Sequence, residues 1–589
     1  MKRENIDIKY KWNTEEIFSS EKEFYALLKK VSNSICFDEY KGKLDNEKTI
    51  YDCYKKCEMV AYDLEKLSVY AMMKKDENSL NKSAIEMSDA VDNVYLKFSM
   101  NTSFISTELS SLDTDTLVKL SKSELLKDYD RDLQSIIKYK PHMLSEEGEK
   151  LLASSAKVLG GFHEIFHFID NVDLDFPTIT VDGKKVKVTH ATYSSLLQSQ
   201  DRKVRKSAYK KYYKAYEKVL NTITSIYRGN LNKDVFLKNA RKFDSCLDKA
   251  LFGEEVDKKV YESLLASVNE NLPVMHDYIK YRKELLSYDK LYMYDISVPM
   301  FENADIQLEY EEAYELVKEG LKPLGKDYIE LLDRAKNERW IDVYENDGKR
   351  SGAYSVCVYG LNHPYVLLNH TKTTHSVFTI AHEMGHAIHS YKSNKSQPQS
   401  KADYKIFVAE VASTVNEMLL IKYLINKEQD NKVKKYLLSY YIDTIRTTLF
   451  RQTMFAEFEY IAHNMAENEE PITKEAFNKI YFDLNVKYYG DSVVSDKEIS
   501  YEWARIPHFY RAFYVYKYAT GIISAINISE KILSEGQTAV DNYFKFLSSG
   551  GSDTPTELLK IAGVDLTTKE PYVLAMNSFK NALNELKNL

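Results

Sequence analysis

Residues that interrupt regular structure are scarce in this chain, which has only 19 Gly and 11 Pro among 589 residues. Because Gly and Pro end helices and punctuate strands and turns, their scarcity favours long helices over many short strands. A chain of this length also exceeds what one hydrophobic core usually supports, so two or more domains are expected. We therefore expect a mostly α protein with more than one lobe.

Helical spacing of apolar residues runs from residue 14 to about residue 170 and resumes after residue 200. Apolar side chains recur every three or four positions between Phe24 and Val31, and Thr14 is the expected N-cap of that helix. Ser145 is the expected N-cap of a second amphipathic stretch, PHMLSEEGEKLLASSAKVL. These patterns predict successive amphipathic helices.

Two segments have the alternating pattern of strands instead. In FPTITVDGKKVKVT, alternating apolar residues flank Asp182-Gly183, which predicts a type I′ hairpin. We place the domain boundary there, with an N-terminal helical region at 1–188 and a second region at 189–589. A strand-rich patch at 340–369 contains GAYSVCVYG and YVLLNH, and predicts a small sheet just before the segment TIAHEMGHAIHS.

Charge and cysteine usage exclude several classes of protein. The formal net charge is −7 and no long basic stripe occurs, so nucleic-acid binding has no electrostatic support. The five cysteines include no CxxC pair, which argues against a disulfide framework and for a reducing compartment. No apolar run approaches the roughly 18 residues of a membrane span, and MKRENIDIKYKWN lacks the apolar core of a signal peptide. We expect a cytoplasmic protein without a membrane segment.

The His-Glu-x-x-His spacing, typical of catalytic zinc helices, occurs twice. The first copy, HEIFH, spans His163 to His167 and lies between Gly160-Gly161 and Pro177. These flanking residues predict a helix of only two or three turns, and phenylalanines surround the pair. We therefore expect two half-buried histidines that pack among aromatic side chains and bind no metal.

The second copy, HEMGH, has the features of a metal site. His382 and His386 lie one turn apart on one helix face, so both imidazoles can reach one metal ion. Glu383 lies beside them, where its carboxylate can deprotonate a water molecule. Gly385 removes a side chain where another group can approach closely.

A catalytic zinc site needs a third protein ligand and one open position. The metzincin pattern is excluded because His389 and Lys392 stand where it requires Gly and His. A later, strongly apolar helix supplies Glu410, our predicted third ligand, and Glu417, a predicted hydrogen-bond acceptor for a ligand imidazole. Both belong to a predicted polar stripe on one helix face that also includes Asp403, Ser413 and Thr414.

Three separated segments, FTIAHEMGHAIHS, FVAEVAST and IPHFYRAFYVYKYATG, resemble in their order and spacing oligoendopeptidase F and the wider thimet-oligopeptidase-like zinc peptidases. The resemblance implies one zinc ion per chain, with Glu383 as general base. It places the metal on His382, His386 and Glu410. Composition alone favours a packing role for the aromatic third segment. The resemblance implies that it binds substrate and stabilises the transition state, through His508 and one or more of Tyr510, Tyr514 and Tyr516, with Tyr516 the best match by position.

The same resemblance extends to the substrate strand and to the fold. SGAYSVCVYG resembles an edge strand that pairs with the substrate backbone, which implies substrate contacts at Gly352, Ala353 and Tyr354. The family fold is a mostly α, two-lobed helical shell around a deep substrate channel, with a small β-sheet beside the zinc helix. Such a channel would restrict substrates to short, unstructured peptides.

We therefore expect a zinc metallo-endopeptidase that hydrolyses internal bonds of oligopeptides, with the zinc-bound water activated by Glu383. One alternative is a zinc carboxypeptidase or dipeptidase on the same fold. It would need a cation for the terminal carboxylate, for which Arg511 and Lys517 are candidates. Another alternative is a non-catalytic helical scaffold, against which the retained Glu383 argues, because a binding protein needs no base.

Overall fold

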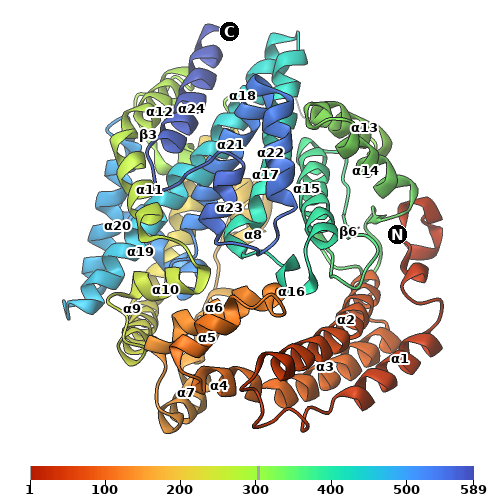
Figure 1. Ribbon diagram of the computed structural model, residues 1–589. Helices are drawn as coiled ribbons and strands as arrows, with labels where there is room; N and C mark the ends of the chain where they lie inside the picture. Colours follow the sequence, from red (N-terminus) through yellow and green to blue (C-terminus); the bar gives the residue numbers. More distant parts are fainter. Residues whose placement is uncertain (1, 302–305) are drawn as a thin grey trace. The chain divides into compact units, whose positions relative to one another are not determined.

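The computed structural model describes residues 2–301 and 306–589 (Figure 1). Within that part of the chain helices dominate, and the strands form two sheets of two strands and one of three. The longest helix, α9 (Arg202–Ala240), has 39 residues. The predicted mostly α fold is confirmed. No helix among the described residues is long and apolar enough to cross a bilayer.

The described residues form two compact units, each assembled from three stretches of chain. Unit 1 contains residues 2–141, 306–424 and 528–564. Unit 2 contains residues 142–301, 425–527 and 565–589. The division into regions 1–188 and 189–589 stays a prediction, as does the substrate channel.

Unit 1 begins with a group of amphipathic helices. Side by side in Figure 1 lie α1 (Glu21–Ser34), α2 (Glu47–Glu77) and α3 (Lys82–Thr102), followed along the chain by α4 (Phe104–Ser111), α5 (Thr114–Ser121) and α6 (Asp130–Tyr139). Phe24 and Val31 are buried, as their spacing predicts. The predicted cap Thr14 was wrong, because Thr14 starts a separate short 3-10 turn and Ser20 caps α1 by accepting the Glu23 N–H at 3.4 Å.

The middle and last stretches of unit 1 contain the second His-Glu-x-x-His copy. In chain order they form α13 (Tyr310–Leu321), α14 (Lys326–Asn337), β4 (Ile341–Asp342), β5 (Tyr354–Val356), β6 (Tyr365–Leu367), α15 (Thr374–Ser396), α16 (Gln399–Ala402), α17 (Ile406–Lys427), α22 (Gln537–Leu547) and α23 (Pro555–Ile561). The sheet order is β4-β6-β5, with β4 parallel and β5 antiparallel to β6. Both β5 and β6 pack against α15, which confirms the small sheet predicted beside this helix.

Unit 2 is built around α9. Its other elements are α7 (Glu146–Phe168), β1 (Thr178–Val181), β2 (Lys184–Lys187), α8 (His190–Leu196), α10 (Cys246–Glu254), α11 (Lys258–Glu270), α12 (Leu272–Leu285), β3 (Leu291–Tyr292), α18 (Asn431–Ile445), α19 (Arg451–Glu467), α20 (Lys474–Tyr489), β7 (Val493–Val494), the start of α21 (Tyr516–Glu535) and α24 (Glu570–Asn588). Asp182 and Gly183 have φ of +49° and +79°, so the predicted type I′ hairpin between β1 and β2 is confirmed. Ser145 caps α7 as predicted, by accepting the Gly148 N–H at 3.2 Å.

Candidate metal centre

The helix α15 presents the two histidines of HEMGH on one face. Thr373 caps the helix, with its hydroxyl accepting the Ser376 N–H at 3.2 Å. The apolar residues of the helix are buried in unit 1: Val377, Phe378, Ile380, Ala381, Met384, Ala387 and Ile388. His382 and His386 are half-buried on the remaining face, with ring centroids 4.8 Å apart. Burial of the apolar face therefore holds both imidazoles in one direction.

Three possible ligand atoms converge at this face. The Nε2 atoms of His382 and His386 are 3.2 Å apart, and Glu410 Oε2 lies 3.4 Å from the first and 3.7 Å from the second. A tetrahedral zinc ion with ligands at about 2.0–2.1 Å has edges of about 3.3–3.4 Å between them. Among the described residues these three side chains form the one group of this kind that could hold a metal ion. Their spacing fits the predicted set of three protein ligands.

Close packing of α15 against α17 brings Glu410 to the histidines. A Cβ atom at Gly385 would lie 2.5 Å from the Cα atom of Ser413 and 2.7 Å from the backbone oxygen of Ala412. Gly385 thus permits the close approach that the sequence predicted. The buried Asn416 ties the two helices together by donating to the carbonyl of Ala381 at 2.9 Å.

Glu417 lies where the sequence prediction places an acceptor. Its Oε1 atom is hydrogen-bonded to Nδ1 of His382. With Nδ1 bonded to Glu417, the Nε2 atom of His382 faces Glu410 and His386. Loss of the Nε2 proton would leave the tautomer that a metal ligand needs. Glu417 therefore orients the imidazole ring of His382 and favours a proton on its Nδ1 atom.

The predicted polar stripe on α17 is only partly correct. Asp403 lies outside the helix, which begins at Ile406, so its inclusion was wrong. The hydroxyls of Ser413 and Thr414 donate to the backbone carbonyl of Glu410 at 2.9 and 2.7 Å. Both hydroxyls thus have a hydrogen-bond partner on their own helix.

The charges around the site favour a cation. Burial opposes the charged imidazolium of His382, but hydrogen bonds to Glu410 and Glu417 raise its pKa to about 10. Hydrogen bonds from the two histidines hold the pKa of Glu410 well below its usual range. Burial raises the pKa of Glu383, against the attraction of His382 and His386. A carboxylate with a raised pKa is a stronger base, as a proton acceptor at neutral pH needs to be.

The other copy, HEIFH, lies in unit 2 on α7. This helix continues through Gly160 and Gly161, so the expected helix of two or three turns was wrong, because a helix interior tolerates Gly at a cost of only about 1 kcal/mol. His163 and His167 are exposed and not half-buried as expected, whereas Phe166 is buried. Neither histidine belongs to a cluster of three possible ligands within the described residues. That this copy binds no metal stays a prediction.

The aromatic segment of unit 2 separates into exposed and buried side chains. His508 is exposed, its Nε2 atom lies 3.2 Å from the hydroxyl of Tyr518, and its ring lies 6.0 Å from that of Tyr514. Tyr510 is 7% exposed and stacks on Phe166. Tyr516 is fully buried, with its ring 5.2 Å from that of Tyr261.

This arrangement adds a candidate that sequence reasoning missed. The partly exposed Tyr518 joins His508 and Tyr514, while the two predicted residues Tyr510 and Tyr516 turn inward. The sequence carried no signal for this difference, because Tyr510 and Tyr514 have the same four-residue spacing as Tyr514 and Tyr518, and only burial separates them.

The predicted substrate strand β5 is the edge strand of its sheet. Gly352 precedes it with φ of +84°, and its carbonyl accepts from the Asn369 amide at 2.8 Å. The Tyr354 hydroxyl donates to Asp76 at 2.8 Å, which anchors that side chain in unit 1. Within the described residues, the backbone edge of β5 that faces away from β6 has no strand partner. Gly352, Ala353 and Tyr354 thus lie at or just before an edge that an extended peptide can join.

A mostly helical fold in which a His-Glu-x-x-His helix meets a glutamate from a later helix is characteristic of metallopeptidases. The model of peptidase family M3 matches residues 195–578, and that of an oligopeptidase F region matches residues 108–176. The chain belongs to peptidase family M3 and is a metallopeptidase.

Relatives match over the full length of the chain. Oligopeptidase PepF of Bacillus subtilis (strain 168) is 40% identical over 100% of this chain and 88% of its own. The crystal structure of a Chlamydophila abortus protein is 34% identical, with a TM-score of 0.93 over 100% of this chain and 99% of its own. That of oligoendopeptidase-F from Enterococcus faecium is 33% identical, with a TM-score of 0.73 over 98% and 99%. The likeness to the oligoendopeptidase F group inferred from three segments is confirmed.

Proposed function

We propose that this protein is a cytoplasmic zinc endopeptidase that hydrolyses internal bonds of short, unstructured oligopeptides. The observation that supports zinc is the convergence of two imidazole nitrogens and one carboxylate oxygen at the spacing of a tetrahedral site. His382, His386 and Glu410 would hold one ion. Zinc bound there supplies a Lewis acid that polarises the scissile carbonyl and acidifies a water molecule.

The proton-transfer role falls to Glu383. It neighbours His382 on α15, and burial raises its pKa toward the range of a general base at neutral pH. Its carboxylate takes the proton of the attacking water and delivers it to the leaving amine. Glu417 holds His382 in the ligand tautomer throughout.

Each unit, taken by itself, has candidate substrate contacts. The free edge of β5 pairs with an extended peptide backbone by β-augmentation, at Gly352 to Tyr354. In unit 2, His508, Tyr514 and Tyr518 present polar atoms on exposed or partly exposed side chains, which suits donation to the substrate better than the buried Tyr516.

Two substitutions separate the base from the ligand. Glu383→Gln removes the proton acceptor and no ligand, so it should keep about one zinc ion per chain and lose nearly all turnover. Glu410→Ala removes a ligand, so both zinc content and turnover should fall. Glu164→Gln is the matched control in HEIFH, and should change neither. Loss of zinc in Glu383→Gln, or full zinc and turnover in Glu410→Ala, would contradict these roles.

The choice of peptide distinguishes an endopeptidase from its rivals. A peptide blocked at both ends should be cut internally, with fragments identified by mass spectrometry. A carboxypeptidase would require a free C-terminus, and a scaffold would cut neither form. Addition of a chelator should abolish cleavage, and zinc should restore it.

A further inference from the structure

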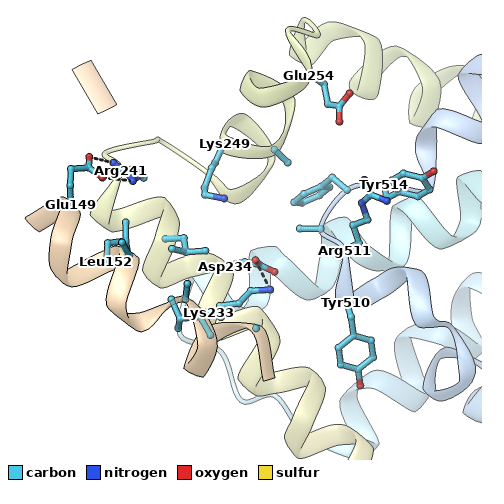
Figure 2. Close-up of a pocket in the computed structure, with 18 of the residues that line it drawn as sticks. Glu149, Leu152, Lys233, Asp234, Arg241, Lys249, Glu254, Tyr510, Arg511 and Tyr514 are labelled. Carbon is cyan, nitrogen blue, oxygen red and sulfur yellow. Dashed lines mark hydrogen bonds and ion pairs between the residues drawn. The ribbon is translucent and has the colours of Figure 1, made fainter. Parts of the chain in front are cut away.

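Unit 2 contains a pocket in which, apart from Tyr514, the lining residues have no role in the proposed chemistry (Figure 2). It lies between α7, α9, α10 and residues 510–517, with a volume of about 670 Å³. Leu152, Leu159 and Leu237 give part of it an apolar wall. Ligand pockets usually have volumes of about 300–1,000 Å³, so this one is large enough for a few residues of a peptide.

The charged lining of the pocket is predominantly cationic. Three acidic residues are each paired with a cation: Glu149 with Arg241, Asp234 with Lys233, and Glu254 with Lys517. Two further cations, Lys249 and Arg511, have no carboxylate at ion-pair distance among the described residues, although the charge of Lys249 helps to lower the pKa of Asp234. The pocket therefore has an excess of two positive charges in a protein whose net charge is −7.

The two unpaired cations are available to a ligand. In Figure 2, Lys249 extends from α10 into the space between the helices, with no dashed line to another drawn residue. The Arg511 guanidinium lies 4.4 Å from the centre of the Tyr514 ring, which holds its position by a cation–π contact and leaves its N–H donors free of a carboxylate. Lys517, a candidate cation in the sequence, is instead engaged by Glu254 at 2.5 Å.

This pocket adjoins the exposed part of the aromatic segment. Tyr510, Arg511 and Tyr514 also line a second cavity of about 490 Å³, whose other walls include His508 and Tyr518. A peptide that contacts His508 and Tyr518 can therefore place a further group in the cationic pocket without leaving unit 2.

We propose that Lys249 and Arg511 bind a carboxylate of the peptide substrate, either its C-terminus or an acidic side chain. The inference rests on the proposed peptidase function and adds a preference to it. The leucine wall of the pocket suits an apolar chain. The ammonium of Lys249 and the guanidinium of Arg511 suit an anionic group at the end of that chain. Removing either cation should weaken binding of peptides that have the carboxylate far more than binding of peptides that lack it.

Binding can be measured without cleavage by using the Glu383→Gln background and fluorescence anisotropy. Three matched peptides are needed: one with a free C-terminus, the same peptide amidated, and an amidated peptide with one Gln replaced by Glu near that end. The unmodified pocket should bind at least one carboxylate peptide about tenfold or more tightly than the neutral peptide. Which carboxylate is preferred identifies its source.

The pocket variants then test the residues. Lys249→Gln and Arg511→Gln should each reduce the affinity ratio of carboxylate peptide to neutral peptide from about tenfold to near one. Arg511→Lys keeps the positive charge and should retain most of this ratio. Lys259→Gln, an exposed lysine on α11 outside the pocket, is the control for charge removal and should leave the ratio unchanged. A ratio near one before substitution, or a ratio that Lys249→Gln and Arg511→Gln leave intact, would overturn the proposal. If the pocket prefers the carboxylate peptide as expected but the wild-type protein cleaves no peptide, the result would count against the peptidase function and not against the carboxylate site.

Discussion

Gly385→Ala should damage the metal centre without changing any ligand. Gly385 lies between the two histidines on α15, and an added Cβ would meet Ser413 Cα at 2.5 Å and the Ala412 oxygen at 2.7 Å. These are backbone atoms, so no side-chain rotation relieves the overlap. Lengthening the distance between the new Cβ atom and Ser413 Cα from 2.5 Å to an ordinary contact of 3.4 Å requires α15 and α17 to move apart by about 0.9 Å.

That displacement is large compared with what the site tolerates. Glu410 lies one turn before Ser413 on α17, so it moves with the helix away from His382 and His386. Productive sites are held to within about 0.5 Å, and a misplacement of about 1 Å can cost roughly 100-fold in rate. We expect zinc affinity to fall about tenfold or more, turnover about 100-fold, and the free energy of unfolding about 1–3 kcal/mol.

Three measurements test this expectation: zinc affinity by competition with a chromogenic chelator, turnover of a quenched peptide, and thermal unfolding. The control is Gly161→Ala, the same substitution inside α7, where an added Cβ meets nothing within 4 Å. It should be neutral or add about 0.5–1 kcal/mol of stability, because Ala favours a helix over Gly. Wild-type zinc affinity in Gly385→Ala would refute the idea that this close packing positions Glu410.

Three further variants test separate parts of the structure. Glu417→Ala leaves all three predicted ligands in place but removes the hydrogen-bond partner of His382. Zinc affinity, measured in the same competition assay, should fall about 10–100-fold. An unchanged affinity would show that Glu417 does not position His382 for the metal. Tyr518→Phe should lower kcat more than Tyr516→Phe, because of these two side chains only that of Tyr518 is partly exposed. A larger loss of kcat in Tyr516→Phe, measured by steady-state kinetics, would instead favour Tyr516, the residue predicted from sequence position. Burial raises the pKa of Glu459 from 4.5 to about 8. Between pH 4.5 and pH 8 the folded protein therefore keeps a proton on this carboxyl that the unfolded chain has lost. The free energy of unfolding consequently falls as the pH rises through this range. Glu459→Gln should therefore gain melting temperature relative to wild type between pH 5 and pH 8, and parallel melting curves would contradict the buried, protonated carboxyl.

Local sequence patterns determined the features that depend on neighbouring residues. Amphipathic spacing without frequent Gly or Pro predicts helices, because the helical repeat relates residues three and four apart. Asp182-Gly183 predicts its hairpin, because few residues adopt positive φ at both turn positions. The spacing of His382 and His386 likewise places both on one helix face wherever the helix lies. Glu410 emerged from the same reasoning, as a carboxylate on a helix too apolar to bury it without a partner.

Only the tertiary structure decided which candidate side chains come together and which are buried. Tyr510 and Tyr516 are indistinguishable from Tyr514 and Tyr518 by composition, yet the first two pack inward. The two His-Glu-x-x-His copies have the same local geometry. What differs is the partner: α17 brings a carboxylate to one copy, while the histidines of the other face outward from α7. Exposure and convergence depend on contacts between helices distant in sequence, and the pattern within a single helix does not encode which partner covers which face.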